Sequence, residues 1–113
     1  MAVAQRDLEI PGGSTVEFVV DVIGGPTDLA GYTGQLHIKD LRTDILPIAE
    51  VPTSAIVVNP GTRQVTVRIP SSETETWLWE RGVYDLLITG PTGEAWRLVE
   101  GRVTNSLPVT EGA

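Results

Sequence analysis

The segment from residue 83 to residue 103, VYDLLITGPTGEAWRLVEGRV, restricts the fold of this chain more than any other. Apolar side chains alternate with other residues in both of its arms, and a Gly-Pro-Thr-Gly turn at 90–93 joins the arms. An alternation with a period of two is typical of strands that bury one face. The segment therefore predicts an antiparallel hairpin whose inward side chains are Tyr84, Leu86, Ile88, Trp96 and Leu98.

The second arm of this hairpin needs one irregularity. Strict alternation after Leu98 would place the carboxylate of Glu100 in the core. A β-bulge shifts the register by one residue, and a glycine inside a strand often marks such a position. We therefore predict a bulge at Gly101 that turns Val103 inward.

The rest of the chain contains short alternating runs separated by Gly and Pro. The segment 41–51 contains Pro47 and alternates poorly, which favours an edge segment or a strand that changes sheets. A type II turn is expected at 59–62, Asn-Pro-Gly-Thr. Many short strands predict an all-β fold, here an antiparallel immunoglobulin-like β-sandwich with one short helix. The further strands are expected at 6–10, 15–22, 34–39, 55–58 and 64–69.

The one short helix is expected at residues 72–78. Ser72 and Glu75 have the spacing of a capping box, and Gly82 follows the place where the helix would end. Trp77 or Leu78 would then cover the core. The core is expected to comprise Val16, Phe18, Val20, Leu36, Ile38, Val65, Val67, Ile69, Leu78, Tyr84, Leu86, Ile88, Trp96 and Leu98.

Length and charge limit the organisation and the partners of the chain. Its 113 residues suit a single domain, and we expect the sandwich over 1–104 and an extended C-terminal tail over 105–113. The absence of Cys excludes disulfides and thiolate chemistry. A net charge of −7 disfavours nucleic acid. No apolar run approaches the roughly 20 residues that span a bilayer, so a membrane is not expected as a partner either.

Candidate catalytic groups are sparse in this sequence. His37 is the only histidine, and we expect it on the outward face of a strand, in solvent. The acidic residues lack the pattern of a glycosidase pair or a calcium loop. The Gly-rich turns lack the helix and the lysine of a phosphate-binding loop. We therefore expect no enzymatic activity, no cofactor and no metal.

The three tryptophans have two interpretations. Trp77, Trp79 and Trp96 would form a sugar-stacking platform in a carbohydrate-binding β-sandwich module. Trp77 and Trp96 are, however, expected to face the core, which leaves Trp79 partly exposed. A single exposed tryptophan is more typical of an anchor in a protein interface.

Several motifs resemble those of small virion proteins of tailed phages. The C-terminal part resembles the ending YDLxIxxPxGxxxRLLxGxVxVxxxVT of that group, through residues 84–86, 90–93, 96–98, 101–103 and Val109-Thr110. The stretch GYTGQL at 31–36 is similar to a strand motif of the group, and SSET at 71–74 to its helical motif. The likeness runs over nearly the whole chain. It extends to the immunoglobulin-like N-terminal module of phage baseplate upper proteins.

The resemblance implies a non-enzymatic structural component of a tailed-phage virion, an adaptor or peripheral protein of the tail or baseplate. Such a protein is made in the host cytoplasm, and homo-oligomeric copies contact other virion proteins on a symmetric particle. A capsid (head) decoration protein is the alternative within the virion, and a carbohydrate-binding module is the alternative from another class. The expected interface residues are Trp79, Leu41 and Ile45 of the edge segment, and Leu107 and Val109 of the tail.

Overall fold

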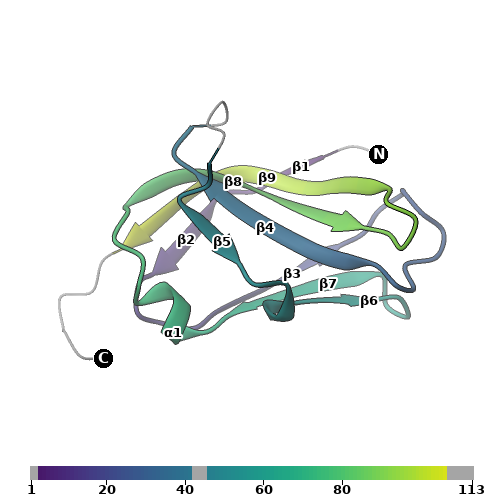
Figure 1. Cartoon of the computed structure of the whole chain (residues 1–113), viewed down its shortest axis with the longest axis horizontal. Helices are drawn as coiled ribbons and strands as arrows, with labels where there is room; N and C mark the ends of the chain where they lie inside the picture. Colours follow the sequence, from purple (N-terminus) through teal and green to yellow (C-terminus); the bar gives the residue numbers. More distant parts are fainter. Residues whose placement is uncertain (1–2, 42–45, 107–113) are drawn as a thin grey trace.

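The structure is a computed structural model that describes residues 3–41 and 46–106. These residues form two β-sheets that lie one above the other as the layers of a sandwich (Figure 1). The elements are β1 (Ala4–Gln5), β2 (Leu8–Pro11), β3 (Val16–Asp21), β4 (Thr33–Lys39), β5 (Ala49–Val51), the 3₁₀ turn η1 (Thr53–Ala55), β6 (Ile56–Asn59), β7 (Gln64–Ile69), α1 (Ser71–Thr74), β8 (Arg81–Thr89) and β9 (Ala95–Ser106).

The strand order is that of an immunoglobulin-like sandwich, which confirms the predicted fold class. The smaller sheet has the order β3-β7-β6, and the larger has β1-β9-β8-β4-β5 with β2 also on β9. In immunoglobulin lettering, the first is the order B-E-D, and β9-β8-β4 is G-F-C. The strand pairs are antiparallel, except that β1 and β2 run parallel to β9.

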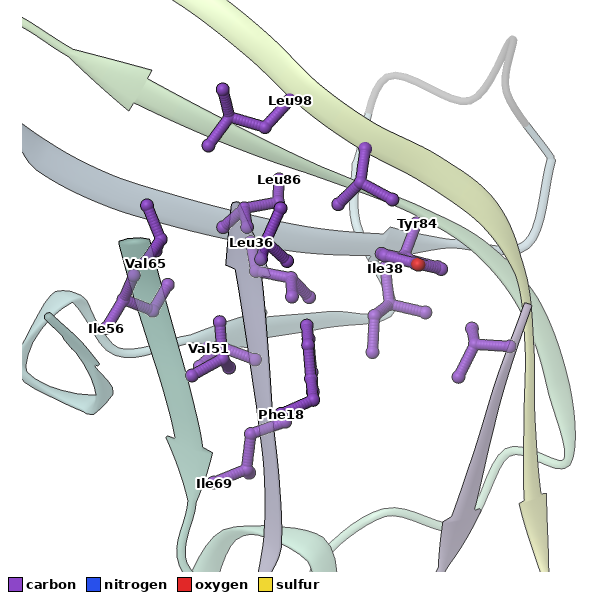
Figure 2. Close-up of a cluster of buried hydrophobic side chains, with 14 of the residues drawn as sticks. Phe18, Leu36, Ile38, Val51, Ile56, Val65, Ile69, Tyr84, Leu86 and Leu98 are labelled. Carbon is purple, nitrogen blue, oxygen red and sulfur yellow. The ribbon is translucent and has the colours of Figure 1, made fainter. Parts of the chain in front are cut away.

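The core lies between the two sheets, and strands of both layers contribute to it (Figure 2). Most of the predicted core side chains are buried there: Phe18, Val20, Leu36, Ile38, Val65, Val67, Ile69, Tyr84, Leu86, Ile88 and Leu98. Val16 and Trp96 are half-buried and pack against this cluster. Leu78 was the wrong choice, because its side chain is 82% exposed.

The helix is shorter than predicted, which explains the error at Leu78. It spans Ser71–Thr74, and no side chain caps its N-terminus, so the predicted capping box does not form. After this helix, residues 75–76 form a turn, in which the Thr76 and Trp77 amides donate to the Glu73 and Thr74 carbonyl oxygens. Trp77 and Trp79, which flank Leu78, both pack against the core. Their ring centroids are 5.3 Å apart. A period of two in this segment leaves Leu78 in solvent, while Trp77 is the buried lid residue.

A β-bulge is present in β9, but it lies earlier than predicted. Leu86 pairs with Val99 and Leu87 with Arg97, so Leu98 is the extra residue. Leu98 and Val99 are consequently both buried, and the inward face then passes to the odd-numbered residues. The bulge therefore lies at Leu98 rather than at Gly101, and Val103 faces inward as predicted.

Gly101 is instead a point of close approach between strands. A Cβ at this position would overlap the carbonyl group of Arg6, which lies between β1 and β2. The Tyr84 hydroxyl donates a hydrogen bond to that same carbonyl oxygen, and the Arg102 amide donates to Asp7 Oδ1 at 3.1 Å. The strand predicted at 6–10 is thus divided at residues 6–7, where the chain is held against β8 and β9.

The turn between β6 and β7 confirms the predicted hairpin but not the type of turn. A type II turn needs a positive φ at Gly61, whereas the positive φ in this turn, 54°, is at Arg63. Asn59 Oδ1 accepts hydrogen bonds from the amides of Gly61 and Thr62, at 3.1 and 3.3 Å. The asparagine side chain therefore shapes the turn.

At its C-terminal end β9 runs to Ser106, two residues into the predicted tail. Asn105 is buried, and residues 107–113 lie outside the described residues. Among the described helices, none is long and apolar enough to cross a membrane.

Candidate functional site

Three exposed leucine and isoleucine side chains lie close together in the sequence, in the connection between β4 and β5. Leu41, Leu46 and Ile48 are 60%, 78% and 40% exposed. Ile48 is fixed close to β4, because its amide donates to the Ile38 carbonyl oxygen at 2.7 Å. We define these three residues as the β4–β5 apolar surface.

The β4–β5 apolar surface borders the edge of the larger sheet. β5 has three residues and pairs on one side with β4, and no other described strand pairs with it, so among the described strands its other side is a sheet edge, as predicted for segment 41–51. An open edge next to exposed apolar side chains is a typical place for another chain to bind.

The structure places only some of the predicted interface residues at this surface. Leu41 belongs to it, whereas Ile45, Leu107 and Val109 lie outside the described residues. Leu46 and Ile48 were missed, although the weak alternation around Pro47 was a signal that their side chains are not in a regular strand.

Trp79 lies elsewhere and is partly exposed, as predicted. It is half-buried and packs against the core. Asn105 Nδ2 donates to the carbonyl oxygens of Trp77 and Trp79, at 3.3 and 2.8 Å, and so fixes the segment before β8 against β9. Trp79 Nε1 and Asn105 Oδ1 are buried without a hydrogen-bond partner among the described residues.

The outer face of the larger sheet has a depression with a volume of about 420 Å³, and β4, β8 and β9 line it. Three acidic side chains and His37 form a row in register on this face: Glu50 on β5, His37 on β4, Asp85 on β8 and Glu100 on β9. Arg97 neutralises part of this row, with Nε 3.3 Å from Asp85 Oδ2 and Nη1 3.7 Å from Glu100 Oε2.

His37 faces outward in this row, as predicted, with Nε2 3.9 Å from Glu50 Oε1. Within residues 3–41 and 46–106, no three His, Cys, Asp or Glu side chains are grouped in a way that could hold a metal ion. The arrangement is one of cross-strand ion pairs on a sheet surface.

Three loops meet at one end of the sandwich, where residues 22–32, 60–63 and 90–94 connect the strands (Figure 1). Arg63 links two of them: its guanidinium donates to the carbonyl oxygens of Gly24, Pro26 and Thr27, at 2.8, 3.0 and 3.3 Å. This contact accounts for the unusual φ of Arg63, since three charge-assisted hydrogen bonds offset the cost of the left-handed backbone.

Tyr32 and Glu94 link the first and third of these loops. The Tyr32 hydroxyl donates to Glu94 Oε1 at 2.9 Å, and the Thr92 hydroxyl donates to Glu94 Oε2. Hydrogen bonds to the carboxylate lower the pKa of Glu94: the largest effect is that of the Thr92 hydroxyl, followed by a backbone hydrogen bond and the bond from Tyr32. Partial burial raises the pKa of Tyr32, and the bond to Glu94 and the charges of Glu94 and Asp28 add to the shift. The loops therefore form one cross-linked tip that carries ionised carboxylates.

No protein-family model matches this chain, and no curated protein is similar to it.

Proposed function

We propose that this protein is a non-enzymatic structural component of a tailed-phage virion, an adaptor or peripheral protein of the tail or baseplate. It would be present in repeated copies that contact other virion proteins. The observation that carries the proposal is the β4–β5 apolar surface next to the open edge of β5. Apolar side chains of this size beside an unpaired strand edge are suited to a contact with another protein chain.

The residues that resemble phage virion proteins lie in the framework of the sheets. The GYTGQL stretch leads into β4, where a Cβ at Gly34 would overlap the side chain of Ile56 in the facing sheet. Gly101 of β9 allows the approach of the N-terminal strands. The shared pattern is therefore one that this type of sandwich requires.

The two alternatives differ in the surface that they need. A capsid (head) decoration protein would use the same apolar surface, so the two virion roles differ only in where the protein is found. A carbohydrate-binding module would need an exposed aromatic platform. Trp77 is buried and both Trp79 and Trp96 are half-buried, so the described residues offer no such platform.

The test begins with particles from the source of this sequence. Mass spectrometry of purified tailed particles should detect the protein, and antibody labelling in electron micrographs should place it at the tail, the baseplate or the head. Neighbouring genes for tail proteins, head proteins or glycosidases would favour the three roles in turn.

A variant with Leu41→Asp and Leu46→Asp then tests the surface itself. It should fold normally, because both side chains are exposed, but enter particles less often. The matched control is Val57→Asp, which changes an exposed valine (59%) on the other sheet. Equal incorporation of both variants would remove the β4–β5 apolar surface from the interface.

A further inference from the structure

Within residues 3–41 and 46–106, three cationic side chains on the larger sheet make no salt bridge, although Asp7 Oδ1 accepts a hydrogen bond from the backbone amide of one of them, Arg102. Seven of the eight Lys and Arg residues lie in the described part of the chain. Four of these have contacts: Arg68 with Glu17, Arg97 with Asp85, Arg6 over the ring of Phe18, and Arg63 with loop carbonyls. The other three, Lys39, Arg81 and Arg102, make no salt bridge within the described residues, although Asp40 and Glu80 are their chain neighbours.

The strand register brings these three cations together on the outer face. Val83 of β8 pairs with Lys39 of β4 on one side and with Arg102 of β9 on the other. Paired residues of adjacent strands are about 5 Å apart. Arg81 is two residues before Val83 on the same face, about 7 Å along the strand. We call this group, centred on Val83, the basic triad.

The basic triad is unusual in a chain with a net charge of −7. Lys39 and Val83 also line the depression of about 420 Å³ on this face, together with the half-buried Leu87. Of the triad, Lys39 alone is among the residues that line this depression, and Asp85 and Glu100, both paired with Arg97, line it too. An acidic group is the complement of the triad itself.

The cross-linked loop tip of the same chain has that charge. Asp28 and Glu94 are exposed there, and both charges act on the phenol of Tyr32 between them. The hydrogen bonds of Arg63 and Tyr32 fix the loops before any partner arrives, which lowers the entropic cost of binding.

The tip cannot reach the basic triad of its own chain. β4 begins beside the tip at Thr33 and ends at Lys39, and six residues of strand span about 20 Å. The tip lies at one end of the long axis of the molecule (Figure 1). Only a second copy can bring the two surfaces together.

We propose that copies of this chain associate head to tail, with the Asp28–Glu94 tip of one copy docked on the basic triad of the next. Such a contact is heterologous, so it builds rings if the rotation closes and filaments if it does not. The inference shares with the proposed function only the expectation of repeated copies. It is tested on the purified protein, whereas the proposed function is tested on particles, so either can fail alone.

Lys39 is the only lysine in the sequence, which gives a specific chemical readout. A carbodiimide joins an amine directly to a carboxylate that it contacts. At low salt, cross-linked dimers should contain Lys39 joined to Asp28 or Glu94, and high salt should suppress them. Lys39→Arg should abolish this cross-link while sedimentation velocity still shows association. Lys39 joined only to carboxylates outside the tip would refute the proposal.

A charge exchange provides the decisive control. The first variant carries Lys39→Glu, Arg81→Glu and Arg102→Glu, and the second carries Asp28→Lys and Glu94→Lys. Each should be folded by circular dichroism and monomeric alone, because its two surfaces now have the same sign. An equal mixture should associate again. A monomeric wild type at all concentrations, or a mixture that stays monomeric, would overturn the proposal.

Discussion

Tyr84→Phe separates one buried hydrogen bond from the volume of the side chain that makes it. Tyr84 is buried in β8, and its hydroxyl donates to the Arg6 carbonyl oxygen between β1 and β2. Phenylalanine fills the same space but leaves this carbonyl without a donor. An unmade buried hydrogen bond costs about 1–2 kcal/mol. With an unfolding entropy of about 2 cal/mol/K per residue, Tm should fall by about 4–8 °C.

The effect of the same substitution on the free energy of unfolding should depend on pH in a characteristic way. Burial raises the pKa of Tyr84 to about 12, with the Arg6 charge opposing the shift and the Asp7 charge adding to it. The unfolded pKa is about 10. The pKa of Tyr84 is higher in the folded state than in the unfolded state. The contribution of the Tyr84 hydroxyl to the free energy of unfolding is therefore complete below about pH 10 and is lost as the pH rises toward about 12. The loss amounts to about 2–3 kcal/mol, at about 1.4 kcal/mol per pKa unit.

The measurement is the free energy of unfolding by urea, near neutral pH and from about pH 9 to about pH 12. Wild type should be more stable than Tyr84→Phe at neutral pH, and the difference should vanish near about pH 11. The control, Tyr32→Phe, should keep the alkaline loss due to Tyr84. Equal stability of wild type and Tyr84→Phe at neutral pH, or an alkaline loss that persists in the variant, would refute the reasoning.

Three further substitutions, two of them with a matched control, test the packing and one group of buried hydrogen bonds. Gly101→Ala should destabilise the fold by about 1–3 kcal/mol, because its Cβ would overlap the backbone carbonyl group of Arg6. The control Gly61→Ala, in an open turn, should change the free energy of unfolding by less than about 0.5 kcal/mol. Phe18→Ala should cost about 3–5 kcal/mol, and Leu78→Ala should be nearly neutral because that side chain is exposed; thermal melting checks both. Asn105→Ala should cost about 2 kcal/mol and change tryptophan fluorescence, since it removes the donor to two carbonyls.

The core was predictable because a period of two assigns alternate side chains to one face. Phe18, Leu36, Val65 and Leu86 are buried, and each lies in an alternating run, although Val19 and Leu87 are apolar exceptions to the alternation. The fold class followed from the number and spacing of such runs. No long-range contact needed to be known for these assignments.

The errors occur where a distant segment decides the local structure. The bulge lies at Leu98 because Leu98 and Val99 can both enter the core, while Gly101 is needed for the approach of the segment near Arg6. This contact joins residues that are far apart in the sequence, so strand patterns do not reveal it. The predicted two-turn helix ends at Thr74, and the two tryptophans that follow, Trp77 and Trp79, pack against the core.

The candidate surfaces were predictable to different degrees. Leu41 was identified from the irregular segment around it. The basic triad was not, because Lys39, Arg81 and Arg102 come from three strands and meet only through the register.

The most direct test of the central claim is the copy number of this protein in purified tailed particles, measured by mass spectrometry against labelled peptide standards. A structural component that works as repeated copies should be present in each particle in several copies, at a fixed ratio to the major tail or head protein. Absence from intact particles, or a trace amount that varies between preparations and is removed by a salt wash, would contradict the account.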